Sequence, residues 1–411
     1  MYTVWYSTES VADYFISKTA LKDRNYKKSK LFESDANNPR LFHTLPDHIK
    51  RILYLDAPDL IVELDSEPIF SVEISTEAGT GHNAFQRFAR LAASVENDVP
   101  AFYVYPDAKV VSRDRAPDRW DRLNPLILLA LEEVMRLYDI PALFYAFPTH
   151  FKADPLLESP QSLMMQGLKY EPDSQFSSCP LSDDPEMKLL FQGIDEVVEI
   201  VETNGPIKGR QMLLKSLVIR ARRTAMAQMY AETGGDVDMS PLTSIIAVDT
   251  QILLDRLSLS AGSHYEFGRL LPSRKESVIY CVNAKFRGDP YPGCLAAIDY
   301  LKCRQGRTFE DRRSNLVIAF GEVSLDGPKP LLNVLPSKQQ TVDDFVSAVR
   351  SSETKNLLAT ATYSNLSGEQ IPRYYMQCRY GSTFSKVKHI RVYSYFADAI
   401  LFPDGSFWRD G

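Results

Sequence analysis

The amino-acid sequence predicts an α/β protein with two domains. The first has a mixed sheet flanked by helices, and the second is of α+β type. Short runs rich in β-branched and aromatic residues alternate with helix-like runs in the first third of the chain. The 411 residues suffice for two to three domains of roughly 150 residues each. The 44% apolar and 24% charged residues are the ordinary balance of a globular protein.

The first predicted elements are a helix and a β-hairpin. Residues 45–55 have the apolar spacing of a helix. Residues 60–64 form a short apolar run, and residues 69–76 form a second run rich in β-branched and aromatic residues. The turn-forming segment 65–68 separates them. The sequence therefore predicts two antiparallel strands joined by a short turn.

A helix, a strand, a helix and a strand are expected next. Asn83 is placed to cap a helix that continues to about residue 97, and residues 101–106 form a buried strand. Asn124 followed by a proline opens another helix, because asparagine caps helices and proline suits their first turn. The apolar run 142–147 is the last strand predicted in this domain.

We expect the first domain to cover residues 1–155 and a Pro-, Ser- and Asp-rich linker to cover 156–185. The second domain, 186–411, is predicted to begin with a helix that starts at Asp184-Pro185 and ends near Gly205. The later elements are predicted in chain order as helices over 209–230 and from Ser240-Pro241, strands over 277–283, 315–321 and 389–402, and a turn at Asp404-Gly405.

Several protein classes are excluded or disfavoured by missing features. The five cysteines form no C-x-x-C pair, so a structural zinc site is not expected. No zinc-protease, serine-hydrolase or P-loop motif occurs. No apolar run approaches the ~18 residues of a membrane span, and the N-terminus has no basic segment followed by an apolar core. We therefore expect a cytoplasmic protein that does not contact membranes.

The residues that point to chemistry lie in the predicted hairpin. Asp59 follows Pro58 at the start of the first strand, and Glu73 lies in the second. Across a hairpin these carboxylates can approach each other and hold Mg²⁺, which needs only one or two protein carboxylates. The two-residue period of a strand puts Glu73, Ser75 and Glu77 on one face.

This segment resembles the PD-(D/E)XK nuclease superfamily over residues 45–148. The resemblance rests on Pro58-Asp59, the 14-residue step to Glu73, and the order helix, hairpin, helix, strand. It implies a restriction-endonuclease-like fold and hydrolysis of phosphodiester bonds by metal-activated water, with Mg²⁺ (or Mn²⁺) held by Asp59 and Glu73. It also implies a supporting role for Gln86 on the following helix.

One position departs from the family pattern. The lysine expected two residues after the second acid is Ser75 here, and serine is too weak a base to replace it. Glu77, His82 or Arg87 could supply the missing role. The candidate catalytic residues are therefore Asp59, Glu73, Ser75, Glu77 and Gln86.

A second candidate site lies in residues 278–321. Asn283 to Lys285 resemble an acid-x-lysine motif with asparagine in place of the acid, but no upstream Pro-Asp accompanies them. This half is either a non-catalytic relative of the first or a chance likeness.

The net charge of −6 is unevenly distributed. Residues 1–204 hold 20 basic and 33 acidic residues, and residues 205–411 hold 27 and 20. Basic stretches can neutralise phosphates and supply non-specific affinity for nucleic acid, or they can be solvated surface. The candidate DNA-binding residues are Lys208, Arg210, Arg220, Arg222, Arg223, Lys285, Arg287, Arg304, Arg307, Arg373, Arg379, Lys386, Lys388 and Arg391.

The leading hypothesis from sequence is a Mg²⁺-dependent DNA endonuclease of the restriction type. Cleavage of both strands of a duplex needs two active sites, which predicts a homodimer. The alternative is a nucleic-acid-binding or regulatory protein with an inactive nuclease core, and a hydrolase of small phosphate esters is a third interpretation.

Overall fold

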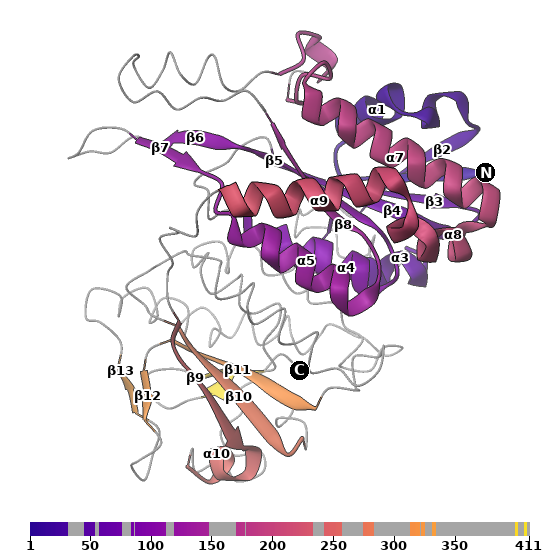
Figure 1. The fold of residues 1–411 in the computed structure, drawn as a ribbon. Coiled ribbons are helices and arrows are strands. Elements are labelled where there is room, and N and C mark those ends of the chain that lie inside the picture. Colours follow the sequence, from indigo (N-terminus) through magenta and orange to yellow (C-terminus); the bar gives the residue numbers. More distant parts are fainter. Residues whose placement is uncertain are drawn as a thin grey trace. The chain divides into compact units, whose positions relative to one another are not determined.

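The structure is a computed structural model of the whole chain, and the described part consists of several separate ranges. These are residues 1–31, 45–53, 57–75, 84–85, 87–111, 119–147, 170–176, 178–232, 242–256, 274–282, 313–320, 322–324, 331–333, 399–401 and 407–408. They form two compact units, the first containing every element from β1 to α9 and the second those from β9 to β15 (Figure 1).

A six-stranded mixed sheet is the centre of the first unit. In spatial order its strands are β2 (Tyr26–Lys30), β1 (Tyr2–Tyr6), β3 (Leu60–Leu64), β4 (Glu67–Ile74), β5 (Ala101–Pro106) and β8 (Ala142–Phe147). β3 is antiparallel to both β1 and β4, whereas β5 and β8 continue parallel to β4. The predicted mixed sheet is therefore confirmed, and the predicted hairpin lies at its centre.

Helices cover both faces of this sheet. They are α1 (Glu9–Lys18), α3 (Asp47–Ile52), α4 (Phe88–Glu96), α5 (Leu126–Tyr138), α7 (Pro185–Asn204), α8 (Pro206–Met212) and α9 (Leu217–Glu232). A small hairpin of β6 (Ala108–Val111) and β7 (Arg119–Arg122) precedes α5. The sequence did not indicate this hairpin.

The two sheet faces differ in the helices they contact. On β5, Tyr103 is paired with Glu73 of β4, whose side chain reaches α4. The neighbouring Phe102 points to the opposite face, where it lies 3.3 Å from the Cβ position of Gly193 in α7. Because side chains alternate along a strand, α4 and α7 must cover opposite faces.

Local signals predicted several boundaries correctly. Asp65 and Ser66 both have positive φ, as a two-residue hairpin turn of type I′ requires. The Asn124 side chain accepts a hydrogen bond from Leu126 N at the start of α5, and Asp184 accepts one from Glu186 N at the start of α7. α4 begins later than predicted, at Phe88.

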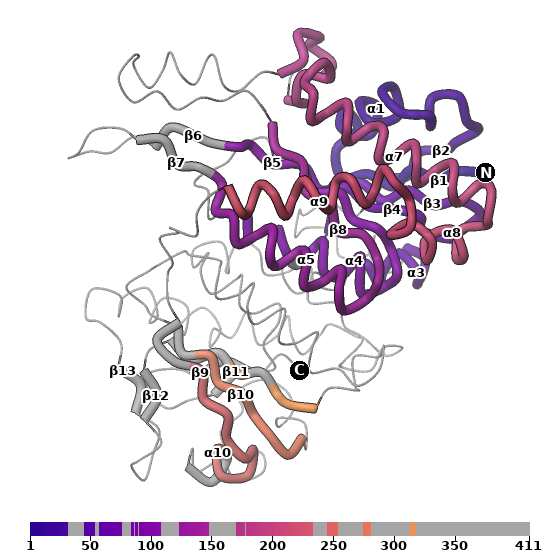
Figure 2. The backbone as a smooth tube through the Cα atoms, in the orientation of Figure 1, coloured from indigo at the N-terminus to yellow at the C-terminus, as the bar shows by residue number. Residues whose placement is uncertain are grey.

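The domain boundary differs from the sequence prediction, because the helices over 185–232 belong to the first unit. The apolar residues of α7 are buried, and residues of β1 and α1 contact this helix. Tyr2 Oη donates to Glu202, and Tyr14 packs edge-to-face against Phe191. Figure 2 shows α7 running beside α1. The sequence shows that α7 is amphipathic, but not which sheet buries it.

Two helix predictions in this region were wrong. The helix expected over 209–230 is interrupted, because Ser216 adopts an extended conformation and its hydroxyl accepts from Val218 N to start α9. The helix expected from Ser240-Pro241 is replaced by strand β9 (Leu242–Asp249), whose β-branched run pairs with β10.

The second unit contains a five-stranded sheet in the order β15-β14-β11-β10-β9. Its further elements are α10 (Thr250–Arg256), β10 (Glu276–Val282), β11 (Ser314–Phe320), β12 (Glu322–Ser324), β13 (Leu331–Asn333), β14 (Ala399–Leu401) and β15 (Phe407–Trp408). β9 is antiparallel to β10, and β11 and β14 continue parallel to β10. β3, β4, β5 and β8 of the first unit have the same sequence of directions. Asn283 to Lys285 and the turn at 404–405 lie outside the described residues.

We predict that Gly209→Ala destabilises the first unit. A Cβ atom at this position of α8 would lie 2.7 Å from the Cα of Val201 in α7, so the two helix backbones must separate. The expected loss is about 1–3 kcal/mol in the free energy of unfolding, measured by urea denaturation. Lys208→Ala, at the exposed neighbouring position, is the matched control and should leave the unfolding midpoint unchanged.

Candidate functional site

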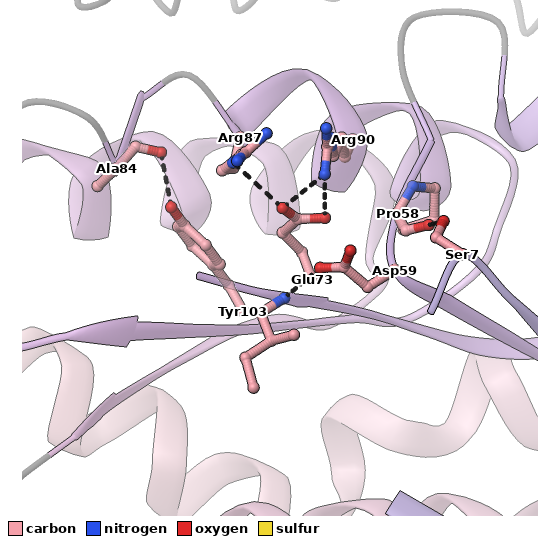
Figure 3. Close-up of polar contacts among 9 residues, drawn as sticks. Ser7, Pro58, Asp59, Glu73, Ala84, Arg87, Arg90 and Tyr103 are labelled. Carbon is pink, nitrogen blue, oxygen red and sulfur yellow. Dashed lines mark hydrogen bonds and ion pairs between the residues drawn. The ribbon is translucent and has the colours of Figure 1, made fainter. Parts of the chain in front are cut away.

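The candidate site lies where Asp59 and Glu73 meet on the central hairpin. Leu60 of β3 pairs with Val72 of β4, and continuing this register places Asp59 opposite Glu73. The Asp59 carboxylate accepts a hydrogen bond of 2.9 Å from the backbone N–H of Ile74 (Figure 3). Asp59 and Glu73 therefore lie at opposing positions of the hairpin.

The end of β1 fixes the Pro-Asp dipeptide. Ser7 N donates to the carbonyl oxygen of Asp59 at 2.9 Å, and Ser7 Oγ donates to that of Pro58 at 3.2 Å. These bonds hold the backbone of the first acid against a neighbouring strand. The Asp59 side chain remains partly exposed at the edge of the site.

Glu73 is completely buried and binds Arg87 at the N-cap of α4 and Arg90 in its first turn. Arg90 Nη1 lies 2.7 Å from one carboxylate oxygen and 2.8 Å from the other. Arg87 Nε lies 3.3 Å from Oε1 (Figure 3). Both cations reach toward solvent, because the Arg90 side chain is 15% exposed and that of Arg87 is 34% exposed.

Burial and charge act in opposite directions on Glu73. Burial raises the pKa of its carboxyl group to about 8, and the nearby Asp59 carboxylate contributes to the rise. Arg90 and Arg87 oppose it by stabilising the ionised form. The site thus holds two acids whose mutual repulsion is relieved by cations.

Polar contacts also anchor α4 beside Glu73. The Ser71 hydroxyl on β4 donates to that of Ser94 on α4 at 2.8 Å, within the buried interface. Tyr103 Oη on β5 donates to the Ala84 carbonyl at 2.9 Å, which fixes the segment preceding the arginines. Burial raises the pKa of Tyr103 well above its ordinary value, so this hydroxyl stays protonated and can donate.

The other predicted catalytic residues are only partly described. Ser75 is buried directly after β4, where its N–H donates to the Val104 carbonyl at 2.9 Å. Glu77 and Gln86 lie outside the described residues, as does His82. Of the three groups considered as replacements for the family lysine, Arg87 is described, and it contacts Glu73.

Sequence reasoning missed Arg90. It follows Arg87 by three positions on a helix, and residues at that spacing lie on the same face. That spacing next to the two hairpin acids was the available signal, but it does not reveal which arginine bridges both oxygens of Glu73.

The donor chemistry fits Mg²⁺. Two hard carboxylates on adjacent strands supply the number of protein ligands that this ion commonly uses. Within the described ranges, no group of three or more His, Cys, Asp or Glu side chains is suited to hold a metal. Asp59 and Glu73 would therefore be the described ligands, and both Glu73 oxygens already contact Arg90.

A second buried carboxylate lies further along β3 and has a separate partner. Glu63 is 2.7 Å from His48 Nε2 on α3, and its side chain is almost completely buried. It therefore offers a matched control for the buried acid at Glu73.

The predicted DNA-binding residues fall into three groups. Lys208 and Arg220 are exposed, whereas Arg210, Arg222 and Arg223 bind acidic side chains of the same unit. The remaining candidates lie outside the described residues: Lys285, Arg287, Arg304, Arg307, Arg373, Arg379, Lys386, Lys388 and Arg391.

Three contacts hold Arg222 within the first unit. It pairs with Glu186 of α7 at 2.6 Å, donates to the Phe144 carbonyl at the outer edge of β8, and lies over the Tyr145 ring. The neighbouring Ala146 N–H donates to Glu186. The Arg222–Glu186 pair thus binds backbone groups on the outer edge of β8. Proteins commonly cover such groups, because exposed ones can pair with strands of other chains.

No family model matches this chain, and neither a curated protein nor a solved structure matches it. Among the helices in the described part, none combines the length and apolar character needed to cross a membrane.

Arg222 and Arg220 are predicted to differ in their effect on stability. Arg222→Ala leaves Glu186 partly buried without its cation and should cost about 3–5 kcal/mol in the free energy of unfolding. Arg220→Ala, on the exposed side of the same helix, should leave it nearly unchanged. Thermal unfolding of the two variants measures this difference. Equal melting temperatures would contradict a structural role for Arg222.

Proposed function

We propose that this protein is a Mg²⁺-dependent DNA endonuclease of the restriction type, with Mn²⁺ as an alternative ion. The observation that carries the proposal is the meeting of Asp59 and Glu73 across β3 and β4, with Asp59 bound to the N–H that follows Glu73. The resemblance of Pro58-Asp59 and Glu73 to the PD-(D/E)XK pattern supports the same chemistry, as does the element order α3, hairpin, α4, β5.

In this proposal each described residue has a defined task. Asp59 and Glu73 hold the metal, which when bound polarises a phosphoryl oxygen and lowers the pKa of water. The bond from Ile74 N keeps the Asp59 carboxylate oriented toward Glu73. The Ser7 bonds hold Asp59 in place, and the Tyr103 bond holds the segment that carries the arginines.

Double-stranded DNA is the proposed substrate, and a homodimer is the proposed assembly. Lys208 and Arg220 are exposed cations of the 205–225 stretch, available for phosphate contacts, and Lys215 is exposed as well. Arg210, Arg222 and Arg223 pair with acidic side chains of the first unit, so they are not among the proposed DNA contacts. Cutting both strands then requires two copies of the site.

We predict that Asp59→Asn and Glu73→Gln each abolish metal-dependent cleavage of DNA. Either change removes a charged oxygen ligand while keeping the size of the side chain. The measurement is loss of supercoiled plasmid in Mg²⁺ or Mn²⁺, with EDTA as the metal-free reference. Normal cleavage by both variants would overturn the assignment of the site.

Glu63→Gln is the matched control for this experiment. It changes a buried acid on the same hairpin to its amide and keeps a hydrogen-bonding group opposite His48. Cleavage by this variant should equal that of the unmodified protein. If all three variants are equally inactive, the loss reflects disturbance of the hairpin and not loss of metal ligands.

The inactive-core alternative has one specific observation in its favour. Arg90 contacts both oxygens of Glu73, and a serine stands in place of the family lysine. Under this alternative the protein binds DNA with a steep salt dependence but does not cleave it in any metal. Binding without cleavage across varied duplexes therefore favours the alternative. Hydrolysis of small phosphate esters without salt-sensitive DNA binding would favour the third interpretation.

A further inference from the structure

The charges around Glu73 balance within the protein itself. In the ionised form that a metal would bind, Asp59 and Glu73 carry two negative charges, which balance the two positive charges of Arg87 and Arg90. A divalent cation added to this group leaves an excess of two positive charges in a largely buried site. The local field would then oppose binding of metal alone and favour metal together with an anionic phosphate.

We propose that Arg90 is a counter-ion that Glu73 exchanges for the metal, and that the released guanidinium then binds the phosphate of the substrate. This inference rests on the proposed nuclease function. It makes metal binding and phosphate binding cooperative, because each relieves a charge that opposes the other. Arg90 would thus act as a substrate-binding residue that also sets the metal affinity.

The geometry of Arg90 suits both partners. A guanidinium presents a planar fork of donors that matches carboxylate and phosphate oxygens equally well. Arg90 contacts both oxygens of Glu73 from a side chain that is still 15% exposed. Arg87 lies three positions earlier in the chain and contacts one oxygen at 3.3 Å. It can therefore remain near Glu73 when Arg90 leaves.

A purely structural role is the competing explanation for the Arg90–Glu73 pair. The helix is already anchored without it, because Ser94 bonds to Ser71 and the apolar residues Phe88, Leu91 and Val95 are buried. Buried ion pairs are moreover weak contributors to net stability, because desolvation offsets their attraction. Arg90 bridges both Glu73 oxygens that would bind the metal. Exchange of Arg90 for the metal therefore explains its position better than a purely structural role.

The test is calorimetric titration of Mn²⁺ into the full chain without DNA, combined with plasmid cleavage. Arg90→Gln should tighten Mn²⁺ binding by about 5- to 150-fold, the usual range of coupling between two ligands, while lowering the rate of cleavage. These changes have opposite signs, whereas structural damage would weaken both. Arg87→Gln is the matched control and should tighten Mn²⁺ binding less.

A conservative variant covers the case in which Arg90→Gln does not fold. Arg90→Lys keeps the charge but cannot present a two-pronged fork, so it should show intermediate tightening and partial cleavage. Melting curves identify which variants are folded. Asp59→Asn in either background should remove Mn²⁺ binding.

The outcomes separate this inference from the proposed function. If the unmodified protein cleaves DNA and the folded Arg90 variants bind Mn²⁺ no more tightly, the exchange is wrong and the nuclease function stands. A second outcome is that an Arg90 variant gains Mn²⁺ binding while the unmodified protein neither binds Mn²⁺ nor cleaves DNA. Arg90 then excludes the metal permanently, and both the nuclease function and the binding of phosphate by Arg90 are overturned. If no protein binds Mn²⁺ or cleaves, both proposals are overturned.

Discussion

A buried carboxylate on a central strand constrains one whole face of the first unit's sheet. Glu73 is enclosed between β3, β5 and the segment entering α4, where an ionised group is costly without opposite charge. Arg90 and Arg87 supply that charge only if α4 docks at one position along β4. The hydroxyl pair of Ser71 and Ser94 and the bond from Tyr103 to Ala84 maintain this position.

The two faces of the sheet contain different ion pairs. The face toward α3 and α4 contains ion pairs and hydroxyl groups, including the separate pair of His48 and Glu63. The face toward α7 packs closely, with Gly193 lying against Phe102 and Tyr145, and it also contains the buried ion pair of Arg222 and Glu186. Both faces therefore combine apolar packing with ion pairs, and the Glu73 carboxylate lies on the face toward α4.

The two units share a pattern of strand directions but not the same buried chemistry. In both, an antiparallel pair is followed by two strands parallel to its second member. The described polar cluster at the start of β10 and β11 includes Thr250, Ser277, Asn315 and Arg274, joined through hydroxyl, amide and guanidinium groups. The described carboxylate that contacts two arginines, Glu73, lies in the first unit.

Local sequence patterns predicted the hairpin, its turn, the helix caps at Asn124 and Asp184, and the placement of Asp59 opposite Glu73. These features depend on interactions within a few residues or across one tight turn, so local patterns reveal them. The packing of segments distant in the chain joins the helices over 185–232 to the first sheet, buries Arg222 against Phe144 and places Arg90 across both oxygens of Glu73. Periodicity identifies an apolar stripe or a basic side chain, but the partner of each can lie anywhere along the chain. Which partner is chosen depends on how all the elements pack together.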